Sequence, residues 1–453
     1  MSDATLGANA VAASGLKTSL LVQHKLMQKR NSAEKRFKLY GVAAIIVSLA
    51  TLFIMLWTIF ADGVSAFRQA TLTFPVMLDQ AVLDPTGNRD TAEIGKVTTI
   101  GYGKVLSSAF KAHLIERGVA TDGVNDKALT ELISRDAPAQ LRNMVLANPR
   151  LIGTKIEFSG YAGGRIDGYF KGRVTMETAK LDSNITQEQL QLADRLRDAG
   201  ILSVQFNSGF LTNPDASDQR PEASGLGIAI IGSIYMMIMV TIMVLPLGIA
   251  ASIYLEEFAP KNRFTDLVEV NISNLAAVPS IVFGILGLAI FINFAELPQS
   301  SSIVGALVIT LMTLPTIIIA TRAAIRAVPP SIRDAALGVG ASKMQTVFHH
   351  VLPLASPGIM TGTILGLATA LGETAPLLLI GMVAFVANYP DGPFDGGIME
   401  PATALPVQVY SWASRSDPAF IERSSGAIIV LLGMLIVMNV IAILLRRRFE
   451  RRW

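Results

Sequence analysis

The 453-residue chain has no cysteine, and only 16% of its residues are charged. Without cysteine there is no disulfide and no thiolate centre for metal or redox chemistry, so any part outside the cytoplasm folds without cross-links. A soluble globular domain carries about 25% charged residues. Here 51% of the residues are hydrophobic and the mean hydropathy is +0.48. The composition therefore excludes a soluble globule and predicts a membrane protein.

The chain also lacks the G-x-x-x-x-G-K-[ST] pattern of nucleotide-binding loops. The nearest approach to it, Gly101-Tyr102-Gly103-Lys104, is incomplete, and we interpret it as a turn. Residues 61–225 show no His, Asp and Glu cluster at metal-ligand spacing and no nucleophile motif. We therefore expect no catalytic residue, no metal and no cofactor in this chain, which is then not an enzyme by itself.

Apolar runs divide the chain into segments. Residues 1–37 form a polar and then basic tail, and residues 38–60 are long enough for a first transmembrane helix. Residues 61–225 are charged and turn-rich, and their length suits one independent α+β domain. Residues 226–445 then predict an all-α core with five further spans. These spans are Leu226 to Leu255, Leu267 to Phe294, Ile303 to Thr321, Pro357 to Val386 and Ser425 to Leu445.

Basic residues gather beside these spans. Lys25 to Lys38 and Arg446 to Arg452 flank the first and last runs, as the positive-inside rule expects of cytoplasmic segments. Six crossings that start inside place both ends in the cytoplasm, including the basic tail 446–453. The loop 322–356 then also lies inside, and residues 61–225 lie outside.

The loop 322–356 contains a polar island with helix-capping signals. Ser331 and Asp334 have the form of a capping box, and Ser342 with Gln345 repeats that form. Gly340, between the two, suits the left-handed position that ends a helix. The sequence predicts two short capped helices here, and a plain interfacial loop is the alternative interpretation.

Two stretches inside the spans carry polar residues. Asn274 and Ser280 flank Pro279, where small and polar groups favour close helix packing and a kink. Glu373 is the only carboxylate well inside the predicted core spans, where an ionisable group costs at least about 2.5 kcal/mol and by default marks function. A purely structural role at a helix break before Pro376 is the alternative for Glu373.

The loop resembles the E-A-A…G…I-x-L-P loop of ABC importer permeases through Asp334-Ala335-Ala336, Gly340 and His350-Val351-Leu352-Pro353. Asp334 stands for the usual glutamate and His350 for the usual isoleucine. In that family the loop docks on the cytoplasmic ATPase and couples hydrolysis to transport. We also expect Pro353 to stop the second helix. The resemblance implies as coupling residues Arg333, Asp334, Ala335, Ala336, Gly340 and Pro353.

Three further stretches are similar to permeases of the phosphate ABC importer, PstA type: NLAAVPSIVFGILGLAIF, LPTIIIATRAAIRAVPPSIRDAALGVGASKMQTVFHHVLPLASPGIMTG and LGETAPLLLIG. The resemblance covers about residues 225–445 and implies a type I ABC importer permease in the bacterial inner membrane, with about six transmembrane helices. It implies three partners, namely a PstC-type permease, a dimer of the PstB-type ATPase that would hold ATP and Mg²⁺, and a PstS-type phosphate-binding protein. Residues 61–225 are similar to a periplasmic insertion found in some of these permeases.

The sequence departs from this family inside the membrane. Many members carry arginines at the positions of Ile319 and Thr369, and here no Lys or Arg lies well inside the last five spans. A phosphate dianion then needs compensation from the partner permease, from helix N-termini or from hydroxyl groups. The residues expected along the path are Glu373, Thr374, Thr369, Asn274 and Ser280. A permease for molybdate or sulfate, or a membrane-tethered sensor that binds a ligand through residues 61–225, remains the alternative.

Overall fold

The computed structural model describes residues 25–382 and 385–449, in two units that meet at Thr58. The first unit consists, in its described part, of helix α1 (Lys25–Gly63), which continues into the second unit. The predicted first span, residues 38–60, falls within this helix. The first 24 residues of the predicted tail 1–37 lie outside the described residues.

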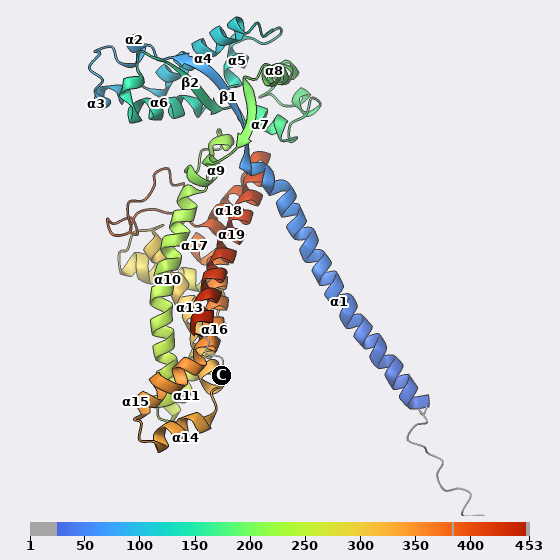
Figure 1. Ribbon diagram of the computed structural model, residues 1–453, viewed down its shortest axis with the longest axis vertical. Coiled ribbons are helices and arrows are strands. Elements are labelled where there is room, and N and C mark those ends of the chain that lie inside the picture. Colours follow the sequence, from blue (N-terminus) through green and yellow to red (C-terminus); the bar gives the residue numbers. More distant parts are fainter. Residues whose placement is uncertain (1–24, 383–384, 450–453) are drawn as a thin grey trace, which may run out of the picture. The chain divides into compact units, whose positions relative to one another are not determined.

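A three-stranded antiparallel sheet organises the inserted domain, residues 61–225. Its strand order is β2-β1-β3, with β1 (Arg68–Met77) at the centre between β2 (Lys155–Tyr161) and β3 (Leu202–Phe206) (Figure 1). The register pairs Phe74 with Phe158 and Leu72 with Leu202. The domain's helices are α2 (Gln80–Leu83), α3 (Thr91–Ile94), α4 (Thr99–Glu116), α5 (Asp126–Glu131), α6 (Ala137–Ala147), α7 (Gly164–Phe170), α8 (Gln187–Asp198) and α9 (Gly209–Thr212).

The domain has its own apolar core, which lies between the sheet and α4. Phe74 of β1 packs with its ring centroid 5.1 Å from that of Phe110 and 6.1 Å from that of Phe158. All three rings are fully buried. The predicted turn at Gly101–Lys104 is wrong, because these residues lie inside α4, where Tyr102 faces the core and its burial outweighs the low helix propensity of the two glycines.

Four long helices lie side by side in the core, namely α10 (Gly227–Ile253), α13 (Ser302–Arg326), α16 (Leu352–Gly372) and α19 (Pro418–Phe449) (Figure 1). Helix α16 meets α13 through glycines four residues apart. A Cβ atom built on Gly362 would lie 2.4 Å from the Cβ of Ala320, and one on Gly358 would lie 2.8 Å from the Cβ of Ala324. Small residues thus let two backbones approach closely, which is how apolar helices associate in lipid.

The predicted span Leu267–Phe294 is not one straight helix. Helix α11 (Arg263–Ala276) and helix α12 (Ser280–Gly287), with a π-helical extension to Phe294, meet at an angle of 101°. Pro279 lies at the bend, where its ring disfavours helical backbone at the residue before it. Pro279 itself has an extended ψ of 136° and is the N-cap of α12. Among residues 25–382 and 385–449, five helices are long and apolar enough to span a membrane, or six if the bent pair counts as one span.

The predicted span Pro357–Val386 also ends early. Helix α16 stops at Gly372, Glu373 is extended, and a short helix α17 (Ala375–Leu379) follows. The expected break before Pro376 is thus present, and α18 (Leu405–Ala413) comes later in the chain. The predicted fold class, an all-α membrane core with an inserted α+β domain, is confirmed.

Buried charges join the inserted domain to the start of α19. Lys171 lies 2.8 Å from Asp167 and 2.9 Å from Glu422, and Arg173 lies 2.5 Å from Glu422. The neighbouring Arg423 is also buried and donates to the carbonyl groups of residues 222 and 224 at 2.8 and 2.6 Å. Paired and hydrogen-bonded in this way, charges can be buried where an isolated charge could not.

Candidate functional site

The loop 322–356 lies at the ends of α10 and α13 away from the inserted domain (Figure 1). Its first helix, α14 (Pro330–Gly338), begins with Pro330 at the first helical position and Pro329 as N-cap. The capping box predicted at Ser331 and Asp334 is therefore wrong, since Ser331 already lies inside the helix. Proline at the first turn starts a helix without a side-chain cap, because its missing N–H would have no partner there.

Gly340 ends α14 in the predicted left-handed conformation, with φ of +90°. The N–H of Gly340 donates to the carbonyl of Leu337 at 3.0 Å, and that of Ala341 donates to the carbonyl of Ala336 at 3.1 Å. These bonds satisfy carbonyl groups that the helix end leaves free. A residue with a Cβ is strained at this φ, so the sharp turn depends on glycine.

The second capping box is confirmed and begins a long helix. The Gln345 side chain accepts from the N–H of Ser342 at 2.8 Å, and the Ser342 hydroxyl accepts from the N–H of Gln345 at 3.2 Å. Helix α15 (Lys343–Thr346) continues through the π-helical residues 347–351 into α16. The prediction that Pro353 stops this helix is wrong, because the π turn has already shifted the hydrogen bonding where the proline N–H is missing.

Arg333 holds the loop against the helices above it. Its guanidinium donates to Glu257 at 2.8 and 3.0 Å and to the carbonyls of Val328 and Ile325 at 2.7 and 2.9 Å. Glu257 follows α10 in the chain, whereas Ile325 belongs to α13. Arg333 therefore points inward and positions α14, whereas Asp334 and Ala335 beside it are exposed.

A second set of ion pairs strengthens the same junction. Glu256 pairs with Arg326 at 2.7 Å and with Arg322 at 3.3 Å, and Arg322 reaches Glu269 of α11 at 2.6 Å. Sequence analysis assigned the arginines to the cytoplasmic side but missed their partners. The signal was available in the sequence, since two glutamates, Glu256 and Glu257, follow the run Leu226 to Leu255 and three arginines lie in the loop 322–356.

The outer face of the loop is apolar and uncovered within the described chain. Val339 is 86% exposed, Met344 is 57% exposed and Leu337 is 48% exposed. Ala336 is buried against the rest of the loop. Exposed apolar side chains on a rigid, polar-rimmed element are typical of a protein docking surface.

The residues predicted along the path lie at the helix breaks and on exposed helix faces. Ser280 opens α12 and Thr374 precedes α17, and these two short helices pack together, with Gly284 close against Pro376. Glu373 is half-buried at the same break. Asn274 is exposed near the end of α11, and the Thr369 hydroxyl is exposed and donates to its own helix.

Comparisons with known proteins find similarity in two parts of the chain. Residues 244–453 match the family described as "Binding-protein-dependent transport system inner membrane component", and residues 24–180 match a "Domain of unknown function". A probable ABC transporter permease, YqgI of Bacillus subtilis, is 32% identical over 46% of this chain and 74% of its own length. The phosphate transport system permease PstA of Mycobacterium leprae is 30% identical over 51% of this chain and 73% of its own. A MetNI methionine ABC transporter chain has a TM-score of 0.38 and 16% identity, over 49% of this chain and 97% of its own.

Proposed function

The chain belongs to the inner-membrane permeases of binding-protein-dependent ABC importers, as a member of the PstA type, and we propose that its cargo is inorganic phosphate. Its relatives include phosphate permeases of several bacteria. The partners we propose are a PstC-type permease, a PstB-type ATPase dimer that holds ATP and Mg²⁺, and a PstS-type phosphate-binding protein. Both chain ends then lie in the cytoplasm of a bacterium and residues 61–225 in its periplasm.

The observation that carries the coupling role is the rigid loop with an apolar outer face. The residues proposed to couple the ATPase to the core are Arg333, Asp334, Ala335, Ala336, Gly340 and Pro353. Arg333 fixes α14 to α10 and α13, so a push on the loop moves these helices together. The helix from Lys343 to Gly372 has 30 residues and is therefore about 45 Å long. It connects the loop directly to the break at Glu373.

At that break the chain can offer hydrogen bonds to an anion. Glu373 and Thr374 interrupt the helix where free backbone groups and hydroxyls suit an ion path. We propose that Thr369, Asn274 and Ser280 line the same path. Because Ile319 and Thr369 stand where many relatives carry arginines, molybdate or sulfate is the competing cargo.

The coupling role is tested by two matched substitutions. Gly340 and Gly338 are both exposed, and a Cβ on either meets no atom within 4 Å, but only Gly340 has a positive φ. We expect Gly340→Val to strain the turn by about 1–3 kcal/mol and to lower ATP-driven uptake roughly tenfold, while Gly338→Val leaves uptake near wild type. Equal uptake in the two variants, in vesicles that hold equal amounts of complex, would contradict the coupling role.

The cargo is tested by uptake of labelled phosphate into vesicles that contain the whole complex. We expect unlabelled phosphate to compete and a tenfold excess of molybdate or sulfate to leave uptake unchanged. If molybdate or sulfate competed more strongly than unlabelled phosphate, that anion would be the cargo in place of phosphate. The coupling role would not be affected by this result.

A further inference from the structure

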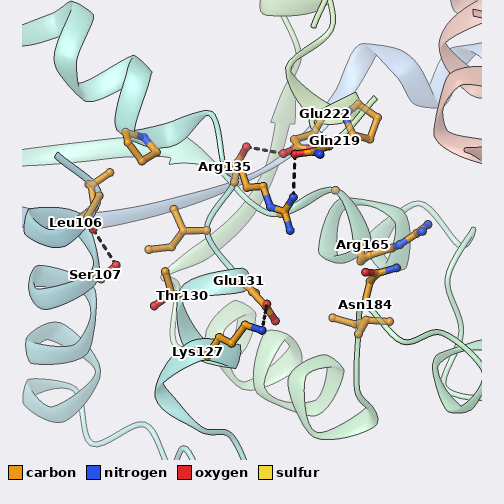
Figure 2. Close-up of a pocket in the computed structure, with 18 of the residues that line it drawn as sticks. Leu106, Ser107, Lys127, Thr130, Glu131, Arg135, Arg165, Asn184, Gln219 and Glu222 are labelled. Atoms are coloured by element: carbon orange, nitrogen blue, oxygen red, sulfur yellow. Dashed lines mark hydrogen bonds and ion pairs between the residues drawn. The ribbon is translucent and has the colours of Figure 1, made fainter. Parts of the chain in front are cut away.

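A cavity of about 1150 Å³ lies in the inserted domain and was not predicted from the sequence (Figure 2). Its walls come from α4, from α5 and the loop after it, from the turn before α7, from the linker that leads to α10, and from the start of α19. Small-molecule sites typically occupy about 300–1000 Å³. The cavity is thus large enough for an organic molecule and far larger than a single inorganic ion needs.

The four carboxylates that line the cavity already have polar partners. Asp218 pairs with Arg415 at 3.3 Å, Asp417 with Arg165 at 3.5 Å, and Glu222 accepts from the Ser134 hydroxyl at 2.5 Å. The fourth carboxylate, Glu131, lies 3.9 Å from Lys127. Each of these groups has its polar partner within the domain or at its junction with α19. A ligand therefore needs no positive charge to pair with these carboxylates.

Two cations on the wall, both exposed to solvent, lack such partners. In the part of the chain that the structure describes, no carboxylate oxygen lies within 4.0 Å of the side-chain nitrogens of Lys104 or Arg135. Arg135 donates only to the Gln219 amide oxygen, at 3.3 Å, and Figure 2 shows its guanidinium directed into the cavity. Hydroxyl groups on the same wall belong to Thr99, Ser107, Ser108, Thr130 and Ser183.

We propose that this cavity binds a hydroxylated organic anion whose phosphate or carboxylate group is held by Arg135 and Lys104. An arginine fork matches the oxygens of either group, and the surrounding hydroxyls and the Asn184 amide complement a polar body. The proposal does not depend on which ion the permease transports, because no residue of the expected path lines the cavity.

The cavity is connected to two core helices. Ser134 and Arg135 bond to Glu222 and Gln219 of the linker, which enters α10 at Gly227. The carbonyl of Glu222 in turn accepts from Arg423 of α19 at 2.8 Å. The wall that carries Arg135 is thus hydrogen-bonded to the linker between the domain and the core, and through the linker to α19.

The experiment measures binding by isothermal titration calorimetry to the full chain in lipid nanodiscs. The probes are glucose 6-phosphate, gluconate, uncharged glucose and inorganic phosphate. We expect glucose 6-phosphate or gluconate to bind, and glucose and inorganic phosphate to bind at least about tenfold more weakly, since each lacks either the charge or the polar body. The affinity for glucose 6-phosphate, compared with the affinity for gluconate, shows whether the site prefers a phosphate or a carboxylate group.

Variants tie the binding to the two cations. Arg135→Gln and Lys104→Gln should each weaken binding at least about tenfold, and Arg135→Lys should weaken it less. Arg117→Gln, an exposed arginine of the same domain outside the cavity, should leave affinity unchanged. Binding of neither organic anion, equal binding of glucose, or unchanged affinity in both Arg135→Gln and Lys104→Gln would overturn the proposal. Tighter binding of inorganic phosphate than of glucose 6-phosphate would also overturn it.

Discussion

The inserted domain and the membrane core are each stabilised by a different kind of packing. The domain has a core of large aromatic and aliphatic side chains and is fixed to α19 by buried ion pairs. The core helices α13 and α16 instead meet through glycine and alanine, with no ion pair between them in the described ranges. In water, burial of apolar area drives packing, whereas in lipid helix association depends on van der Waals packing, which close backbone approach improves, and on hydrogen bonds between helices. The solvent on each side therefore decides which residues hold each region.

We expect the largest loss of stability from a substitution where the inserted domain meets α19. Glu422→Gln removes one of the two carboxylates that face Lys171 and Arg173, while Asp167 stays at 2.8 and 3.4 Å, so we expect a cost of about 1.5–3 kcal/mol. Trp412, whose indole donates to Asp215 at 3.0 Å, reports the junction by fluorescence when Trp57 and Trp453 are replaced by phenylalanine. The exposed neighbour Ile421→Ala is the control. A loss of less than 1 kcal/mol in urea unfolding would show that the ion pairs do not hold the junction.

In the membrane core, we expect stability to be lost when a side chain is enlarged, because the helices there are packed closely. Gly362→Ala places a methyl group 2.4 Å from the Cβ of Ala320, so α13 and α16 must move apart at a cost of about 1–3 kcal/mol. Gly433→Ala, on α19, meets no atom within 4 Å and should be neutral. Unfolding of the chain in mixed detergent micelles, titrated with dodecyl sulfate, measures both. If the two variants unfold alike, glycine packing is not what joins these helices.

A pH effect on stability is expected in the inserted domain. Burial raises the pKa of the Glu222 carboxyl above its ordinary value of 4.5. The folded chain then holds a proton that the unfolded chain has released, so the free energy of unfolding falls as pH rises from 4.5 to the raised pKa. The loss is about 1.4 kcal/mol for each pH unit in that window.

Glu222→Gln should remove this pH dependence and keep an oxygen that accepts from Ser134. Glu157→Gln, at an exposed position on β2, should leave the wild-type slope unchanged. Urea unfolding between pH 4 and 8 measures the slope. A wild-type slope that persists in Glu222→Gln would assign the effect to another group.

We expect the smallest loss of stability from removal of the helix cap at Ser342 in the loop 322–356. Ser342→Ala removes the hydroxyl that caps α15 and should cost about 1 kcal/mol. Ser331→Ala makes the same chemical change inside α14, where no cap exists, and should be neutral. Hydrogen exchange of the amides of residues 343–346 detects the difference. Equal protection in the two variants would mean that the cap contributes nothing to the start of the long helix.

Local patterns were sufficient for much of this architecture. The capping box at Ser342 and the left-handed Gly340 were predicted correctly, because each signal lies within a few residues of the structure that it specifies. The prolines were harder to interpret. Pro353 does not end its helix, whereas Pro279 accompanies a 101° bend, because the neighbouring turn and the packing partners decide what a proline does.

The sequence by itself therefore determined that this is a membrane permease with an inserted polar domain and a glycine-turned loop. Only the tertiary structure decided that Arg333 faces Glu257, 76 residues away, and that the last span is fixed to the domain by Glu422. It alone assembled the cavity from segments between Thr99 and Ala419. Such contacts join residues that are far apart in the sequence, so they depend on the tertiary fold. The pattern of neighbouring residues does not specify them.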